Sequence, residues 1–227
     1  MRENLLKQKL NNGGSVIGTF AKFSDPASAE ILALAGYDFF VLDNEHVMFN
    51  RESILNIVRA AQASGITPLL RVRKHVDVEI LQALDAGIPG ILVPQVNSAR
   101  QASECVSHVK YAPEGQRGFA PTHRAADYGT MDPAVYAQLA NRHTMLGCYC
   151  ETRQAVEEID EIARIPGIDL IFLGPMDLSQ SYGVTGKADA PAVMNAIGRV
   201  IDACGTAGRA VGIIASNASQ AYDYLRR

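Results

Sequence analysis

The chain has 227 residues, 48% of them hydrophobic and 20% charged, which is typical of a globular protein with one sizeable core. A net charge of −3 and a pI near 6.0 exclude a protein that binds nucleic acid through a basic surface. No stretch approaches the roughly 20 apolar residues of a membrane span, and the first residues contain no signal-peptide core. We therefore expect a cytoplasmic protein with no nucleic-acid or membrane partner.

Short apolar runs alternate with helical patterns along the chain, as they do in repeated βα units. The predicted strands cover residues 16–20, 39–42, 67–72, 90–93, 145–150, 170–173 and 210–214. Seven strands in this order predict an α/β fold, a TIM (β/α)8-type barrel that lacks the last strand and helix in this chain. We expect the barrel to form a single domain over residues 1–227.

The predicted helices lie between these strands. Asp25 and Pro26 are the capping and first-turn residues that begin the first helix, and Gly36 ends it. Residues 50–64 form the clearest amphipathic pattern, with Gly65 as the stop. Further helices are predicted at residues 76–86, 98–109, 153–163, 192–207 and 219–225. Residues 110–133 are rich in Gly and Pro without a clear period, which predicts a long functional loop.

The four cysteines have no Cys-x-x-Cys spacing. They are Cys105, Cys148, Cys150 and Cys204. Two of them lie in apolar runs, where thiols pack as small hydrophobic side chains. We expect structural cysteines rather than a metal or redox site.

Polar side chains follow most of the predicted strands. Because a (β/α)8 barrel collects its catalytic groups at the carboxyl ends of its strands, these positions are the candidates for a site. They are Asp43, Glu45, His46, Arg71, Arg73, Gln95, Glu151 and Asp177. The sequence therefore predicts an active site at this end of the strands.

Glu151 and Asp177 are the candidate metal ligands. Glu151 ends the fifth predicted strand, and the two-residue period places it on the same face as Tyr149. Asp177 follows a Gly-Pro turn that lets backbone amides approach a ligand closely. Two carboxylates on neighbouring strand ends suit Mg²⁺ or Mn²⁺. Two other interpretations stay open: Glu151 pairs with Arg153, or Asp177 caps the next helix.

The chain resembles the HpcH/HpaI aldolase family of metal-dependent pyruvate aldolases over residues 16–214. The motifs that carry the resemblance are Gly18-Thr19-Phe20, Ala35-Gly36-Tyr37-Asp38, Asp43-x-Glu45-His46, Arg71-Val72, Leu84-Asp85-Ala86-Gly87-x-x-Gly90-Ile91-x-Val93-Pro94, Tyr111-Ala112-Pro113-x-Gly115-x-Arg117-Gly118, Glu151-Thr152 and Phe172-Leu173-Gly174-Pro175-x-Asp177-Leu178-Ser179. Several are specific in combination, although none is specific alone.

The resemblance implies a carbon–carbon lyase that cleaves or forms 4-hydroxy-2-oxo acids from pyruvate and an aldehyde, through a metal-stabilised enolate. It implies that Glu151 and Asp177 bind the divalent ion, which is Mg²⁺, Mn²⁺ or Co²⁺. The residues expected to contact pyruvate are Arg71, Tyr149, Gly174, Pro175 and Met176. The family also implies a homo-oligomer, either a hexamer or a trimer of dimers.

The cluster after the second strand is expected to handle charge and protons. His46 is the candidate acid/base, because imidazole side chains can move protons, and Asp43 is expected to orient its ring. Arg71 is expected to stabilise the negative charge that develops on the enolate oxygen. Glu45 would assist metal-bound water or pair with Arg71. The alternative is that Asp43 and Glu45 cap the following turn and that His46 is a surface residue.

Two loop arginines are further candidates for substrate binding. Arg117 and Arg124 either hold a substrate carboxylate or lie in solvent.

The chain departs from the family pattern at three points. Tyr149 stands where the family usually has Gln, and Met176 where a small residue is typical, which predicts shifted substrate specificity. The family usually continues beyond Tyr224 into a Gly-rich strand and a helix exchanged between subunits, and this chain lacks both.

Three other functions remain open. One is a related lyase or decarboxylase that acts on an oxo acid, since a metal-stabilised enolate serves these reactions as well. Another is a non-catalytic metabolite-binding paralogue whose pocket is closed by Tyr149 and Met176. A nucleotide site at residues 183–187 is the weakest, because these residues lack Walker A spacing and follow no strand.

Overall fold

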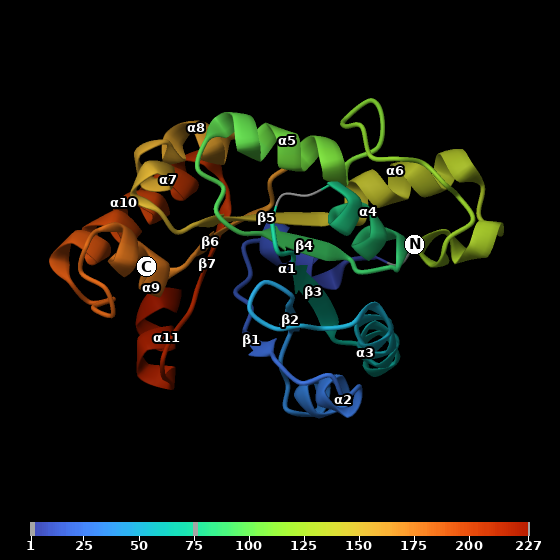
Figure 1. Cartoon of the computed structure of the whole chain (residues 1–227), viewed down its shortest axis with the longest axis horizontal. Coiled ribbons are helices and arrows are strands. Elements are labelled where there is room, and N and C mark those ends of the chain that lie inside the picture. The colour runs from blue at the N-terminus through green and yellow to red at the C-terminus, as the bar shows by residue number, and fades with distance from the viewer. Residues whose placement is uncertain (1–2, 75–76, 227) are drawn as a thin grey trace. The chain divides into compact units, whose positions relative to one another are not determined.

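A computed structural model describes residues 3–74 and 77–226 (Figure 1). The strands are β1 (Gly18–Ala21), β2 (Phe39–Asp43), β3 (Thr67–Arg71), β4 (Gly90–Val93), β5 (Met145–Cys150), β6 (Leu170–Leu173) and β7 (Ala210–Ile213). The helices are α1 (Leu5–Asn11), α2 (Ala27–Leu34), α3 (Arg51–Ser64), α4 (Asp77–Asp85), α5 (Ala99–Val109), η1 (Arg124–Gly129), α6 (Pro133–His143), α7 (Arg153–Glu157), α8 (Ile159–Arg164), α9 (Pro175–Ser181), α10 (Pro191–Ala207) and α11 (Ala218–Leu225).

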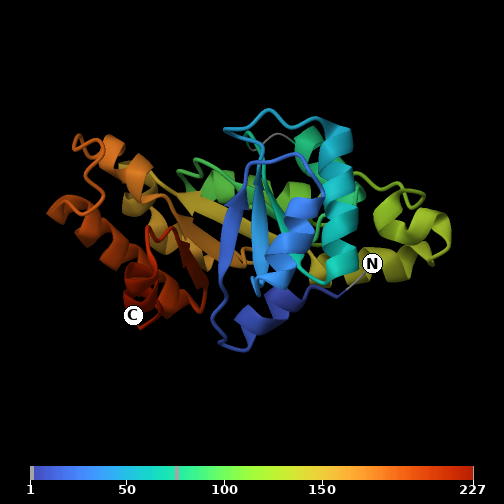
Figure 2. The same ribbon diagram turned by 90° about the horizontal axis from the view of Figure 1, so that it is seen from below.

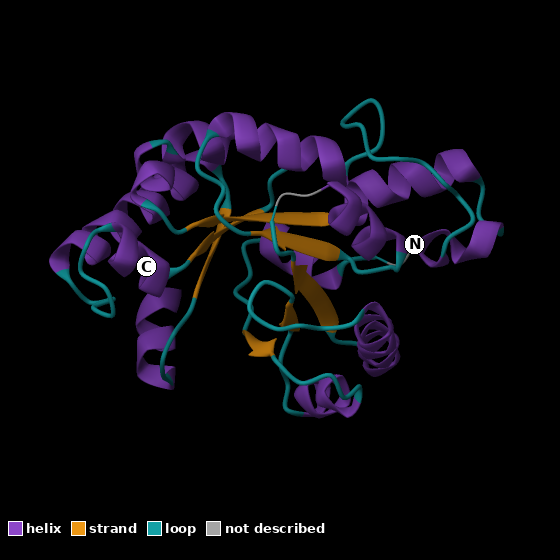
Figure 3. Ribbon diagram, viewed as in Figure 1, coloured by secondary structure: helices purple, strands orange, loops and turns teal. Residues whose placement is uncertain are grey.

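The chain divides into two compact units. The N-terminal unit consists of Met1–Val93 with Cys105–Leu146, and the C-terminal unit of Pro94–Glu104 with Gly147–Arg227. In each of them, helices connect successive parallel strands (Figure 3). The prediction of a single domain stays a prediction.

In the N-terminal unit, β1 to β4 pair in chain order and in parallel. α2 and α3 lie side by side and pack on β2 and β3 (Figure 2). The side chain of Asn50 accepts a hydrogen bond from the Ser53 N–H at the start of α3, and Gly65 ends the helix at a φ of 78°. The predicted apolar stripe of α3 is buried as expected: Ile54, Ile57, Val58 and Ala61.

In the C-terminal unit, β5, β6 and β7 pair in parallel, and α10 packs against α7, α8 and β7. The strand order of the seven-stranded sheet follows the chain from β1 to β7. All seven predicted strands are confirmed, with three of them matching to the residue. The α/β fold of TIM-barrel type is therefore confirmed, and β7 is the last strand in the part of the chain that the structure describes.

The helix predictions were less complete. The predicted helix at 153–163 is wrong as one element, because Glu158 leaves the helical conformation (φ −95°, ψ 7°) and separates α7 from α8. Four further elements, α1, η1, α6 and α9, were not predicted from the sequence. The predicted helix at 76–86 is found as α4, although its first predicted residue lies outside the described residues.

Two features agree with the composition. All four cysteines are free and buried, so they pack as small apolar side chains. Among the described residues, no helix combines the length and the apolar character needed to cross a membrane.

Candidate functional site

Arg71 is clamped by two carboxylates at the carboxyl ends of β2 and β3. Asp43 and Arg71 are register partners on these neighbouring strands. The Arg71 Nε donates to Asp43 Oδ1 at 3.0 Å, and its Nη2 lies 2.7 Å from Oδ2. The Nη1 lies 3.2 Å from Glu45 Oε2. Because these contacts fix the guanidinium plane, Arg71 is preorganised to face a planar anion.

The pKa of Asp43 reflects this clamp. Burial alone would raise the pKa of the Asp43 carboxyl, but hydrogen bonds from Arg71 and from the His46 backbone, together with the charge on Arg71, lower it overall. Asp43 is 1% exposed. A buried carboxylate that stays ionised is what a buried guanidinium needs as its partner.

His46 is placed differently from the expectation. Asp43 Oδ1 accepts from the His46 backbone N–H at 3.2 Å, so the contact that the structure establishes is with the backbone and does not orient the ring. The imidazole Nε2 lies 3.8 Å from Glu45 Oε2, and the side chain is 60% exposed. Asp43 therefore caps the turn and holds Arg71, while His46 remains accessible from solvent.

Glu151 is buried at the end of β5, with its carboxylate held by a backbone amide. The Gln95 N–H donates to Glu151 Oε1 at 2.7 Å, and the side chain is only 4% exposed. In the next residue, the Thr152 hydroxyl donates to Asn97 Oδ1 at 2.5 Å. Thr152 is also the N-cap of α7, and its side chain accepts from the Ala155 N–H. The second carboxylate oxygen, Oε2, faces Gly174.

Glu151 and Asp177 converge on one small volume. A Cβ placed on Gly174 would lie 3.1 Å from Glu151 Oε2 and 3.2 Å from Asp177 Oδ2. Only a residue without a side chain leaves that space open between the two carboxylates. The turn from β6 into α9 thus brings the two predicted metal ligands together.

The two simpler interpretations of these carboxylates are wrong. Arg153 pairs with Glu157 at 2.9 Å, rather than with Glu151. The N-cap of α9 is Gly174, without a side-chain cap, and Asp177 lies in the first turn of the helix. A salt bridge with Arg153 therefore does not account for Glu151, and a helix cap does not account for Asp177.

Tyr149 and Met176, two of the three departures from the family pattern, lie in contrasting environments. Tyr149 is buried, and its ring stacks on Phe172 with the ring centroids 4.8 Å apart. Phe172 is also the register partner of Gly212, where an added Cβ would lie 2.7 Å from the Phe172 ring. The Tyr149 ring on β5, two residues before Glu151, is thus buried against the Phe172 ring of β6. Met176 is 58% exposed at the start of α9, next to the buried Pro175.

The loop arginines do not lie in solvent. Arg117 is buried, 2.6 Å from Asp85 Oδ1, with its guanidinium over the ring of Tyr111. Arg124 donates to the carbonyl of Ala86 and to the side chain of Gln62. Both arginines therefore anchor the loop of residues 110–133 to the rest of the N-terminal unit, at Asp85, Ala86 and Gln62.

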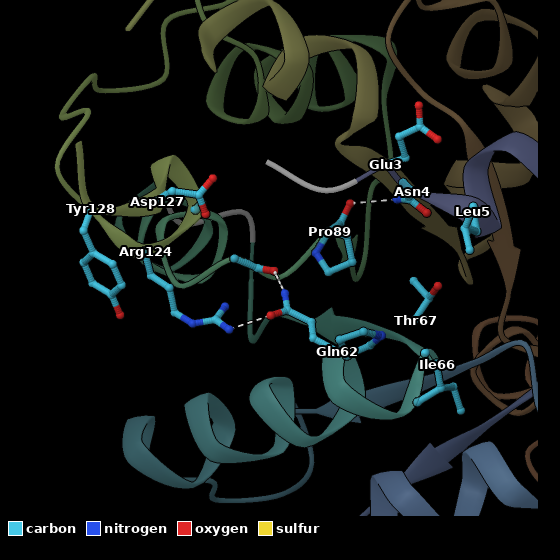
Figure 4. Close-up of a pocket in the computed structure, with 14 residues that line it drawn as sticks. Glu3, Asn4, Leu5, Gln62, Ile66, Thr67, Pro89, Arg124, Asp127 and Tyr128 are labelled. Carbon is cyan, nitrogen blue, oxygen red and sulfur yellow. Dashed lines mark hydrogen bonds between the residues drawn. The ribbon is translucent and has the colours of Figure 1, made fainter. Parts of the chain in front are cut away.

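A cavity of about 320 Å³ in the N-terminal unit lies at the other ends of the strands (Figure 4). It is lined by Thr67, the first residue of β3, and by Pro89, which precedes β4. Arg124 reaches toward Gln62 at its edge. Because catalytic groups of this fold follow the carboxyl ends of strands, this cavity is separate from the candidate site.

The donor set suits a hard divalent ion. Glu151 and Asp177 offer carboxylate oxygens to one volume, and oxygen ligands are those that Mg²⁺ and Mn²⁺ prefer. Among the described residues, no three His, Cys, Asp or Glu side chains form a closed metal cluster. A pair of carboxylates leaves coordination positions for water and for substrate.

Gln95 was among the candidate positions predicted from the sequence, but no role was predicted for it. Its position after a strand was visible, but its contribution comes from a backbone N–H at a φ of 54°. Gln has no special preference for positive φ, so the side chain carries no signal of this conformation.

Comparisons with known proteins identify the family. The sequence profile of the HpcH/HpaI aldolase/citrate lyase family matches residues 16–227. The 2-dehydro-3,6-dideoxy-6-sulfogluconate aldolase of Pseudomonas putida is 36% identical over 218 residues, covering 96% of this chain and 85% of that protein. The hydroxypyruvate/pyruvate aldolase of Agrobacterium fabrum is 37% identical over 224 residues, covering 98% and 84%.

A solved structure shares the fold over almost the whole chain. It is an HpcH/HpaI aldolase/citrate lyase family protein from Burkholderia cenocepacia, 33% identical with a TM-score of 0.93, covering 98% of this chain and 89% of that one. The matched profile, the sequence relatives and the shared fold all lead to one assignment. This chain belongs to the HpcH/HpaI aldolase/citrate lyase family.

Proposed function

We propose that this carbon–carbon lyase is a divalent-metal-dependent aldolase that cleaves or forms 4-hydroxy-2-oxo acids from pyruvate and an aldehyde. The observation that carries the proposal is the convergence of Glu151 Oε2 and Asp177 Oδ2 beside Gly174. Named aldolases among its relatives, at 36% and 37% identity, support the same reaction class.

Glu151 and Asp177 would hold the ion, which is Mg²⁺, Mn²⁺ or Co²⁺. When bound, such an ion acts as a Lewis acid toward the oxygens of an oxo acid. Gly174 keeps the space between the carboxylates open because it has no side chain, and Pro175, which follows it at the start of α9, is expected to contact pyruvate as well. Met176 and Tyr149 are the positions at which we expect this enzyme to differ from its relatives in substrate choice.

Arg71 is the residue that we assign to the negative charge of the enolate oxygen. Asp43 and Glu45 hold its guanidinium rigid, so little reorganisation accompanies the reaction. His46 is the group that we assign to proton transfer, since its imidazole is accessible from solvent and imidazoles are common acid/base groups in catalysis. Asp43 serves both by fixing Arg71 and the backbone of His46.

The test is exchange of the pyruvate methyl protons with D₂O, followed by NMR. We expect EDTA to abolish exchange and Mn²⁺ or Mg²⁺ to restore it. His46→Ala and Arg71→Ala are expected to lower the exchange rate by about 10² or more, whereas His143→Ala, at the end of α6, should leave it unchanged. Exchange that persists in EDTA would contradict the metal mechanism.

An aldehyde panel with pyruvate and Mn²⁺, read by product formation, would identify the second substrate. Location in the cytoplasm and assembly into a homo-oligomer remain predictions. Analytical ultracentrifugation of the purified protein tests the second of these.

A further inference from the structure

Gln95 has an uncommon backbone conformation directly after β4. Its φ is 54°, and among the described residues only Asp127 and Tyr128 share a positive φ without being glycine. Such conformations are rare for residues with a Cβ and persist where the surrounding structure imposes them. The Gln95 side chain is exposed, whereas Pro94 and Val96 on either side are buried. Packing of the Gln95 side chain therefore does not explain its conformation.

The left-handed turn has a clear consequence for Glu151. It directs the Gln95 N–H to Glu151 Oε1 at 2.7 Å. Two residues later, Asn97 accepts from the Thr152 hydroxyl at 2.5 Å. The segment that follows β4 is thus joined at two points to the segment that follows β5. Because Oε1 is bonded to the amide, Oε2 is the oxygen that faces Gly174 and Asp177.

We propose that Gln95 is a positioning residue for the metal-binding carboxylate, acting through its backbone N–H rather than its side chain. The inference rests on the proposed function, because it assigns Glu151 to the metal. A backbone donor fixes the rotation of the carboxylate before any ion binds. Losing that donor removes one hydrogen bond that orients the Glu151 carboxylate, and partners of this kind typically contribute 10- to 100-fold in metal affinity.

Substitutions at position 95 separate the backbone from the side chain. Gln95→Gly and Gln95→Asn adopt positive φ easily and keep the N–H. Gln95→Val disfavours positive φ through its β-branched side chain, so the amide is displaced. Tyr128→Val is the matched control, since Tyr128 has a φ of 55° in η1, within the other unit. It introduces the same backbone strain in the unit that does not contain Glu151.

The measurement is the Mn²⁺ dissociation constant of the full-length protein, by electron paramagnetic resonance, with thermal unfolding of each metal-free variant. We expect Gln95→Gly and Gln95→Asn to bind Mn²⁺ within about twofold of wild type. Gln95→Val should bind about tenfold more weakly or worse. Tyr128→Val should lower the unfolding temperature and leave Mn²⁺ affinity within about twofold. If Gln95→Val does not fold, Gln95→Thr carries the same expectation with a smaller branched side chain.

Two results would overturn the proposal while leaving the proposed function intact. One is a folded Gln95→Val or Gln95→Thr protein with wild-type Mn²⁺ affinity. The other is equal weakening by Gln95→Gly and Gln95→Val, which would assign the effect to the side chain. Wild-type protein that binds no Mn²⁺ and shows no EDTA-sensitive exchange would overturn both proposals together.

Discussion

Gly174→Ala tests the carboxylate pair most directly. The added Cβ would lie 3.1 Å from Glu151 Cβ and Oε2 and 3.2 Å from Asp177 Oδ2, whereas ordinary contacts begin near 3.4 Å. The two side chains must therefore move by a few tenths of an ångström. Gly174 has a φ of −105°, which Ala also adopts, so the substitution strains the site rather than the backbone.

The size of this movement sets the expected effect. Mg²⁺ binds oxygen at about 2.0–2.1 Å, with a tolerance of about 0.2 Å. A displacement of the same size should weaken Mn²⁺ binding about tenfold, which is about 1.4 kcal/mol. We expect the pyruvate exchange rate at limiting Mn²⁺ to fall in proportion, while the unfolding temperature of the metal-free protein changes little.

Gly198→Ala is the matched control for this experiment. Gly198 lies within α10, and an added Cβ there would have no neighbour within 4 Å. Replacing a helical glycine with alanine should stabilise the protein by about 0.5–1 kcal/mol, an increase of about 1–4 °C in Tm for a chain of this size. Mn²⁺ affinity should not change. Wild-type Mn²⁺ affinity in folded Gly174→Ala protein would refute the convergence of the two carboxylates.

Three further predictions concern pH and thiol chemistry. Against the effect of burial, Arg71 lowers the pKa of Asp43 in the folded state, so the stabilisation by the Asp43 carboxylate is present above about pH 4 and is lost as the pH falls through the folded pKa. In urea unfolding, the free energy of unfolding of Asp43→Asn should therefore fall less steeply with decreasing pH than that of wild type. An unchanged slope would contradict this. Burial holds the pKa of His123 below 6.5 despite the Asp85 carboxylate, so the contribution of neutral His123 to stability is complete above about pH 6.5 and is lost as the pH falls. Below that pH, His123→Gln should lose less free energy of unfolding than wild type. An equal loss in the two proteins would argue against it. Burial raises the pKa of Cys150 and Cys204 to about 12. At mildly alkaline pH, a thiol reagent should therefore label neither residue in the native protein, but all four cysteines after denaturation. Rapid labelling of the native protein would show that these thiols are accessible.

Much of the fold could be predicted because its strands are short, buried apolar runs. β4, β5 and β6 match the prediction to the residue, since each run ends abruptly in polar or turn residues. The break between α7 and α8 was not predictable from the periodicity, which continues through Glu158. The missed α6 begins at Asp132-Pro133, a strong start signal that was assigned to the end of the loop.

The neighbours among the candidate site residues could be predicted for a similar reason. Within each unit, parallel strands end at the same edge of a sheet, so Asp43 lies beside Arg71 in the N-terminal unit and Glu151 beside Asp177 in the C-terminal unit. The pairing of these residues was only partly anticipated. Asp43 binds Arg71 and the backbone of His46, whereas the expected contact was with the imidazole ring.

The sequence alone determined the order of the strands, the positions of the polar residues at the strand ends, and the family. These follow from local apolar periodicity and from motifs that can be compared directly. Only the tertiary structure decided that Gln95 turns its amide to Glu151 and that Gly174 opens the space between two carboxylates. The Gln95 contact depends on an uncommon backbone φ, and the space at Gly174 depends on two carboxylates that folding brings together. Neither can be deduced from residue types alone, because the strands must first be paired in register.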